Sequence, residues 1–244
     1  MHGVPLAYKD LFHVVGLPTS CGTKTAEYFR GEHDSTAVAR LTAAGAVTLG
    51  KLNMTELALG PFGDNPHHGN VDNPWKAGCI SGGSSSGSGA AVAAQLAFGT
   101  LGSDTGGSIR LPAACCGIVG LKPTYGRVSR AGAMALSWAL DHLGPMTRTV
   151  QDCALMFELI AGHDPSDGTS SRRPVPAILA GLDGSLSGLR LALPENYYFD
   201  GVTPEVKAAV EAAARGLEAR GARVVPLRLK LARCGVWGGG RCRL

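Results

Sequence analysis

The chain has 244 residues, of which 45% are hydrophobic and 17% charged, and its formal net charge is +4. This length and composition suit a globular enzyme of one large domain or two small ones. Five of the 23 basic residues and none of the 19 acidic residues lie in 228–244, so the rest is nearly neutral and gives no basis for direct nucleic-acid binding. The longest weakly apolar run, 90–98, is too short to span a membrane, and no leader pattern precedes it, so we expect a cytoplasmic protein without a membrane partner.

Strand and helix patterns alternate along the first half of the chain. A helix is predicted to begin at Asp34-Ser35, to turn Val38 and Leu41 inward and to end at Gly45. The small residues of 85–96 also permit a helix after a glycine turn. The strand candidates are short apolar runs, at 4–8, 46–49 and 99–103. This alternation predicts an α/β fold.

The second half continues the pattern until residue 228. The segment 150–160 places one apolar stripe on a helix, made of Cys153, Met156, Phe157 and Ile160. Strands are predicted at 189–193 and 223–225, and 166–188 reads as a surface connection. Thr203-Pro204 starts a second helix whose apolar side chains face one way, at Val206, Val210, Ala213 and Leu217. We therefore expect one domain over 1–228 and a disordered, aperiodic tail over 229–244.

Other sequence features offer no metal or nucleotide site. The seven cysteines include an adjacent pair and no Cys-x-x-Cys spacing, which indicates neither a disulfide framework nor a zinc site, and His67-His68 reads as a loop pair. The segment 45–52 nearly spells a phosphate-binding loop, but Leu52 replaces the required Ser or Thr. At 87–92 a dinucleotide-like pattern has Val92 in place of its third glycine. We expect no metal and no cofactor.

Two clusters of glycine and serine carry the chemistry, at 81–89 and at 102–110. A flexible linker would be polar, whereas both clusters stand between apolar segments. Gly106 and Gly107 precede Ser108, and glycines at such a turn let consecutive backbone N–H groups point toward one anion. A serine beside these groups can attack a carbonyl carbon if a base removes its proton.

The identity of that base decides the enzyme class. Seven histidines are present, but none stands in a recognisable triad setting. The segment Gly83-Ser84-Ser85-Ser86-Gly87 matches the G-x-S-x-G elbow in letters, yet no clear strand precedes it. A Ser-His-Asp site is therefore the weaker interpretation, and the residues considered so far do not identify the base.

Three segments together resemble the amidase signature family. They are Gly3-Val4-Pro5-Leu6-Ala7-Tyr8-Lys9-Asp10, Gly82-Gly83-Ser84-Ser85 and Asp104-Thr105-Gly106-Gly107-Ser108-Ile109-Arg110-Leu111-Pro112. Secondary matches occur at 50–56, 69–75, 117–124 and 141–146, so the resemblance spans most of 3–225. It implies a twisted mixed β-sheet covered by helices on both faces.

The resemblance also implies roles for individual residues. Ser108 is expected to be the acylated nucleophile, Ser84 the bridging serine after a cis peptide at Gly83, and Lys9 the base. Burial would keep the lysine amine neutral, because burial disfavours the charged form. The oxyanion hole would consist of the backbone N–H groups of Thr105, Gly106, Gly107 and Ser108, while Asp104 and Arg110 would brace the turn.

The expected activity is hydrolysis of a carbon–nitrogen bond in a small-molecule linear amide. Family members ordinarily continue beyond both ends of this sequence, so we expect an incomplete fold, with a tail that looks like translation in a shifted frame. A stand-alone amidase is favoured by the segment 65–69. The alternatives are the glutamine-hydrolysing subunit of a tRNA-dependent amidotransferase, with its partner subunits, and an inactive fragment that acts only through association. A homodimer is also a candidate assembly.

Overall fold

The computed structural model describes residues 1–25 and 30–230, and these form two compact units. The first unit runs from Met1 to Leu182 and the second begins at Asp183. The single domain predicted over 1–228 stays a prediction, as does its boundary. The tail predicted to be disordered over 229–244 lies outside the described residues from 231 onward. Its first residue, Leu229, exchanges hydrogen bonds with Asn196 and is therefore held in the fold, contrary to that prediction.

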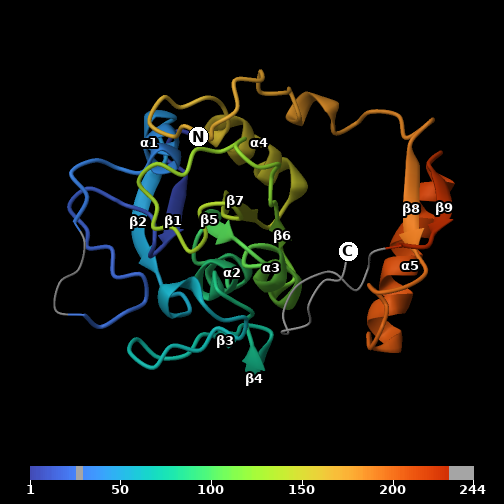
Figure 1. Cartoon of the computed structure of the whole chain (residues 1–244), viewed down its shortest axis with the longest axis horizontal. Coiled ribbons are helices and arrows are strands. Elements are labelled where there is room, and N and C mark those ends of the chain that lie inside the picture. Colours follow the sequence, from blue (N-terminus) through green and yellow to red (C-terminus); the bar gives the residue numbers. More distant parts are fainter. Residues whose placement is uncertain (26–29, 231–244) are drawn as a thin grey trace. The chain divides into compact units, whose positions relative to one another are not determined.

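A five-stranded mixed sheet forms the centre of the first unit (Figure 1). Its strands in spatial order are β2 (Val47–Leu52), β1 (Pro5–Lys9), β5 (Gly99–Asp104), β7 (His142–Thr147) and β6 (Val119–Gly120). Strand β1 lies parallel to both β2 and β5, whereas β7 is antiparallel to β5 and to β6. The carboxyl ends of β1 and β5 therefore meet at one edge of the sheet, which is where ligand sites of α/β folds are found.

Helices cover both faces of this sheet, as predicted. On one face, α1 (Thr36–Ala43) and α4 (Val150–Ile160) pack together and bury their apolar stripes against Leu6 and Tyr8 of β1. Successive residues of a strand point to opposite faces, so Ala7 points to the other side. There α2 (Ser86–Ala93) and α3 (Arg110–Cys116) pack together (Figure 1).

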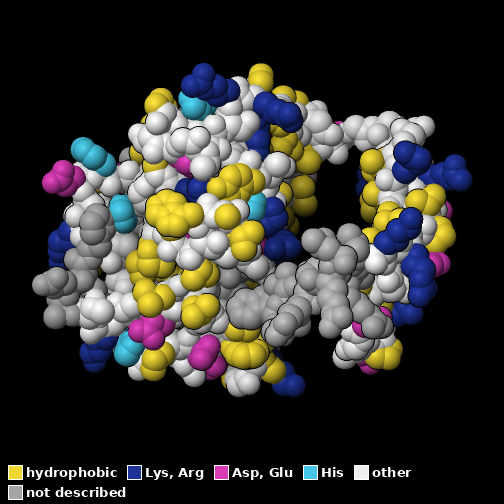
Figure 2. Space-filling model, viewed as in Figure 1, with side chains coloured by type: hydrophobic (Ala, Val, Ile, Leu, Met, Phe, Trp, Pro, Cys, Tyr) yellow, Lys and Arg dark blue, Asp and Glu magenta, His cyan; other side chains and the backbone are white. Residues whose placement is uncertain are grey.

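Short elements complete the first unit. The antiparallel pair β3 (Asp72–Asn73) and β4 (Lys76–Ile80) forms a hairpin, and two single 3-10 turns lie at Glu56–Ala58 and Leu179–Gly181. Apolar side chains remain on the surface of the unit (Figure 2). Among them are Leu96 and Trp138, which are 72% and 79% exposed.

The second unit has two parallel strands, β8 (Arg190–Pro194) and β9 (Arg223–Leu227), joined by the helix α5 (Pro204–Ala219). Both strands and the helix were predicted from the sequence. The apolar stripe of α5 is formed, but Val206, Val210 and Leu217 stay exposed because two strands offer too little surface to cover it. No helix of residues 1–25 and 30–230 is long and apolar enough to cross a membrane.

Candidate active site

Lys9 lies at the end of β1 with its side chain fully buried. Its Nζ donates hydrogen bonds to Oγ of Ser84 at 2.7 Å and to Oγ of Ser103 at 2.9 Å. Ser103 comes from β5, the parallel neighbour of β1, and Ser84 comes from the turn before α2. The sheet and the glycine turn thus bring together a lysine and a serine that are 75 residues apart in the chain.

The buried position sets the protonation state of Lys9. Burial lowers the pKa of the amine from 10.5 to about 7, while the negative charges of Asp104 and Asp141 and the nearby Cys21 oppose this decrease. An amine with a pKa near 7 is substantially neutral at neutral pH and can accept a proton.

The turn that carries Ser84 is closely packed. The peptide bond between Gly83 and Ser84 is cis, as the resemblance implied. The carbonyl oxygen of Ser84 accepts a hydrogen bond from the amide of Thr55. A Cβ on Gly83 would lie 2.6 Å from the carbonyl oxygen of Gly60, so only glycine fits here. Ser84 therefore has a fixed backbone, and its hydroxyl reaches Lys9 rather than a histidine.

Asp104 organises the turn that leads to Ser108. Its buried carboxylate accepts hydrogen bonds from the amides of Gly107, Ile109 and Arg110. It also forms a bidentate ion pair with the guanidinium group of Arg110. Burial alone would raise the pKa of Asp104, but these donors keep that pKa below its ordinary value. The predicted bracing roles of Asp104 and Arg110 are confirmed.

The backbone of this turn offers free donors beside Ser108. None of the described residues accepts a hydrogen bond from the amides of Thr105, Gly106 or Ser108. Gly107 differs from the expectation, because its amide is engaged by Asp104 at 2.8 Å. The hydroxyl of Ser108 forms no hydrogen bond within the described part of the chain, and its carbonyl oxygen accepts one from the amide of Ser85.

A further carboxylate supports the same turn. Asp141 accepts hydrogen bonds from the hydroxyl of Thr105 and from the amides of Leu136 and Ser137. It thereby fastens the loop before β7 to the first residue of the turn. Both Asp104 and Asp141 place negative charge near Lys9 while they hold backbone groups in position.

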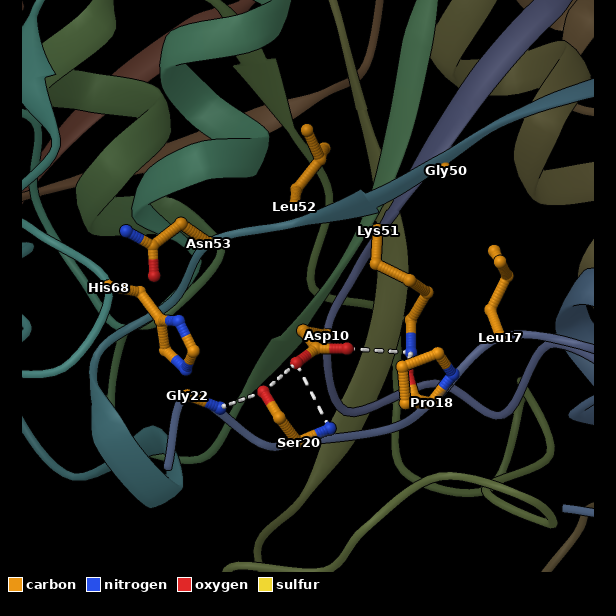
Figure 3. Close-up of a pocket in the computed structure, with 10 residues that line it drawn as sticks. All are labelled: Asp10, Leu17, Pro18, Ser20, Gly22, Gly50, Lys51, Leu52, Asn53 and His68. Carbon is orange, nitrogen blue, oxygen red and sulfur yellow. Dashed lines mark hydrogen bonds and ion pairs between the residues drawn. The ribbon is translucent and has the colours of Figure 1, made fainter. Parts of the chain in front are cut away.

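A cavity of about 430 Å³ lies at the carboxyl ends of β1 and β2 (Figure 3). Its charged groups are Asp10 and Lys51, which form an ion pair at 2.7 Å, and Asp10 also accepts hydrogen bonds from Ser20. Lys51 donates in addition to the carbonyl oxygen of Pro18. Because Asp10 and Lys51 are bonded to each other and to the segment 18–20, we interpret these contacts as structural: they hold the chain that follows Lys9 in place.

The sequence and the fold both match known amidases. The family model named Amidase matches residues 1–233. The chain belongs to the amidase family. Its relatives include a glutamyl-tRNA(Gln) amidotransferase subunit from Geobacter metallireducens, 52% identical over 93% of this chain, and the corresponding subunit from Chromohalobacter salexigens, 53% identical over 93%.

Solved structures of the amidase family superpose closely on this fold. The corresponding glutamyl-tRNA(Gln) amidotransferase subunit from Thermotoga maritima gives a TM-score of 0.89 at 39% identity and covers 94% of this chain. Native peptide amidase from Stenotrophomonas maltophilia gives 0.86 at 40% identity and covers 93%. The chain spans about half the length of these proteins, namely 47% of the two curated relatives and 51% and 48% of the two structures.

The structure joins Lys9 to Ser84 through a hydrogen bond and places Ser108 on the neighbouring turn. Sequence reasoning missed Ser103 and Asp141, although both stand inside motifs that it quoted. The two histidines at 67 and 68 do form a loop pair on Asn65, but His67 also contacts Glu56 at 2.9 Å. No group of three or more His, Cys, Asp or Glu residues that could hold a metal occurs within 1–25 and 30–230.

Proposed function

We propose that this chain carries the catalytic residues of an amide hydrolase that forms an acyl-enzyme on Ser108. The observation that carries the proposal is the 2.7 Å hydrogen bond between Lys9 and Ser84, buried beside a turn with free backbone amides. A neutral amine in contact with a serine hydroxyl is a base that can start proton transfer.

The reaction would proceed in two steps. Neutral Lys9 accepts the proton of Ser84, and Ser84 accepts the proton of Ser108, whose Oγ attacks the carbonyl carbon of a linear amide. The relay returns a proton to the departing nitrogen, and water then attacks the acyl-enzyme by the same route. The contact between Ser84 and Ser108 would form with substrate bound, since catalytic hydrogen bonds often tighten only then.

The negative oxygen of the tetrahedral intermediate needs donors that are already in place. We assign this role to the amides of Thr105, Gly106 and Ser108. Gly107, whose amide is engaged by Asp104, would serve through its backbone conformation, with a φ of +137° that other residues rarely adopt. No cofactor or metal is needed for these steps.

The test compares the purified chain with its Ser108→Ala variant on simple linear amides, with ammonia release as the readout. Hydrolysis by the wild type and its loss in the variant would support the proposal. Mass spectrometry should locate a trapped acyl group on the peptide that contains Ser108. Equal ammonia release from both proteins would reject the proposed activity.

A second candidate is glutamine hydrolysis as one subunit of a tRNA-dependent amidotransferase. It is favoured by the 52% identity to the Geobacter metallireducens protein. Copurification with other subunits, and faster release of ammonia from glutamine than from simple amides, would support this candidate over a stand-alone amidase. Binding to no other subunit and a preference for simple amides would support the stand-alone enzyme.

A third candidate is an inactive chain that acts only through association, favoured by its exposed apolar side chains. Analytical ultracentrifugation separates this case from the others. A homodimer or larger assembly whose ammonia release is unaffected by Ser108→Ala would identify it.

A further inference from the structure

Lys9 has a second hydrogen-bond partner that the proposed relay does not use. Oγ of Ser103 lies 2.9 Å from Nζ, only slightly farther than Oγ of Ser84 at 2.7 Å. Ser103 is buried on β5, and it stands five residues before Ser108. It is therefore too deep in the fold to be a surface neighbour of the lysine.

A neutral amine must be oriented before it can act as a base. It has two N–H groups and a single lone pair, and it can accept the proton of Ser84 only if that lone pair points at Ser84. The lysine side chain has a flexible four-carbon stem, so burial alone does not select this orientation. A fixed acceptor for one N–H group would select it. Ser103 is the second side chain bonded to Nζ in the part of the chain that the structure describes.

The position of Ser103 is itself held by its surroundings. The Oγ of Ser85 accepts a hydrogen bond from the amide of Ser103 at 3.3 Å and can donate to its carbonyl oxygen at 3.2 Å. Ser85 follows Ser84 directly, so the same turn fixes the hydroxyl that gives up its proton and the strand that bears the acceptor.

We propose that Ser103 is a positioning residue, which accepts one N–H hydrogen of Lys9 and so turns the amine lone pair toward Ser84. This inference rests on the proposed function and deepens it. Ser103 would touch neither the substrate nor Ser108; it would act through Lys9 alone.

The proposal predicts that the pKa of Lys9 depends on the hydroxyl of Ser103. The charged groups that face this amine are Asp104 of β5 and Asp141 of the loop before β7, with the thiol of Cys21 nearby. They stay in place when Ser103 is changed. A hydroxyl that accepts from the ammonium form stabilises that form, so removal of the hydroxyl must lower the pKa of Lys9.

The test follows the pKa of Lys9 by NMR in protein labelled at the lysine side chains, for the wild type, Ser103→Ala, Ser103→Thr and Ser88→Ala. Loss of a hydrogen bond to a charged group should lower the pKa by about one pH unit in Ser103→Ala. Ser103→Thr keeps the hydroxyl and should match the wild type. Ser88→Ala is the matched control, because it removes another buried serine bonded to β5 that does not touch Lys9.

A pKa of Lys9 that is unchanged in Ser103→Ala would overturn the proposal. This measurement needs no catalysis, so its failure is distinct from failure of the proposed function, which is judged by ammonia release that depends on Ser108. If Ser103→Ala does not fold, Ser103→Cys takes its place, since a thiol of similar shape is a much weaker acceptor.

Kinetics give a second readout. In Ser103→Ala, kcat should fall about tenfold to a hundredfold with little change in KM, because the base is misdirected while substrate binding is intact. The acid limb of the pH profile should move to lower pH together with the pKa of Lys9. A merely structural role would lower activity without moving that limb, and Ser103→Thr would then fail to restore it.

Discussion

Replacing the buried Lys9 by methionine should change the stability of the protein in a way that depends on pH. The pKa of Lys9 falls from 10.5 in the unfolded chain to about 7 in the folded one. Between these values the unfolded chain binds a proton that the folded chain does not, so the free energy of unfolding of the wild type rises with pH. Methionine binds no proton and removes this dependence.

The magnitude follows from the difference of 3.5 pH units between those two values. Each unit corresponds to about 1.4 kcal/mol, so below pH 7 the buried amine costs about 5 kcal/mol of stability. This cost falls by about 1.4 kcal/mol per pH unit between pH 7 and 10.5 and then vanishes. Lys9→Met also removes the partner of two buried hydroxyls, Ser84 and Ser103, at about 1 to 3 kcal/mol each. That second cost does not depend on pH.

The test is therefore how the stability difference between Lys9→Met and the wild type changes with pH, and not its absolute size at any one pH. Urea unfolding followed by circular dichroism at several pH values from 6 to 10.5 gives the difference in unfolding free energy between Lys9→Met and the wild type. Relative to the wild type, the variant should lose stability steadily between pH 7 and 10.5 and show no further change below pH 7. Ser88→Ala is the control, because it removes a buried hydrogen bond without a titratable group. A difference for Lys9→Met that stays flat between pH 7 and 10 would refute the assignment of a buried, largely neutral amine.

Three further predictions concern the turns around the site. Gly83→Ala would place a methyl carbon 2.6 Å from a backbone carbonyl oxygen, so its thermal unfolding should show a loss of about 1 to 3 kcal/mol, whereas Gly168→Ala, in open space, should show almost none. Asp104→Ala leaves three backbone amides and an arginine without their acceptor, and urea unfolding should show a loss of about 2 to 3 kcal/mol; an unchanged midpoint would contradict its bracing role. Thr105→Val removes the hydroxyl that Asp141 accepts from, and kcat/KM for amide hydrolysis should fall about fivefold, with Thr105→Ser restoring it.

The elements that the sequence predicted are those with a clear local pattern, namely an apolar stripe for a helix or a short apolar run for a strand. The helix at 150–160 could be predicted because its sequence carries an apolar stripe, and the structure shows that this stripe faces the core. Strand β7 was missed because it contains Gly144 and Pro145, which normally argue against a strand inside a sheet. Among the described residues, only the two-residue strand β6 pairs with the side of β7 that faces away from β5, so the missing N–H of the proline is tolerated there.

The contacts of the site also divide into those that were expected from the sequence and those that were missed. The contact between Lys9 and Ser84 was expected from a family resemblance, and no local spacing would have given it. Ser103 was missed because its role depends on β1 and β5 lying side by side, which is a matter of sheet register and not of local pattern. The engagement of Gly107 by Asp104 was missed for a related reason, because a glycine pair predicts a tight turn but not which amide a nearby carboxylate will take.

The long separation in sequence between Lys9 and its partners has a consequence for folding during synthesis. Ser84 and Ser103 follow the lysine by 75 and 94 residues, so no short segment of the chain can bury the amine between these two hydroxyls. During synthesis, Lys9 would leave the ribosome as an ordinary ammonium and would lose its charge only when β5 closes over it. The proposed nucleophile, Ser108, would therefore have no neutral amine to activate it in a nascent or unfolded molecule, and the proposed reaction would require the tertiary structure.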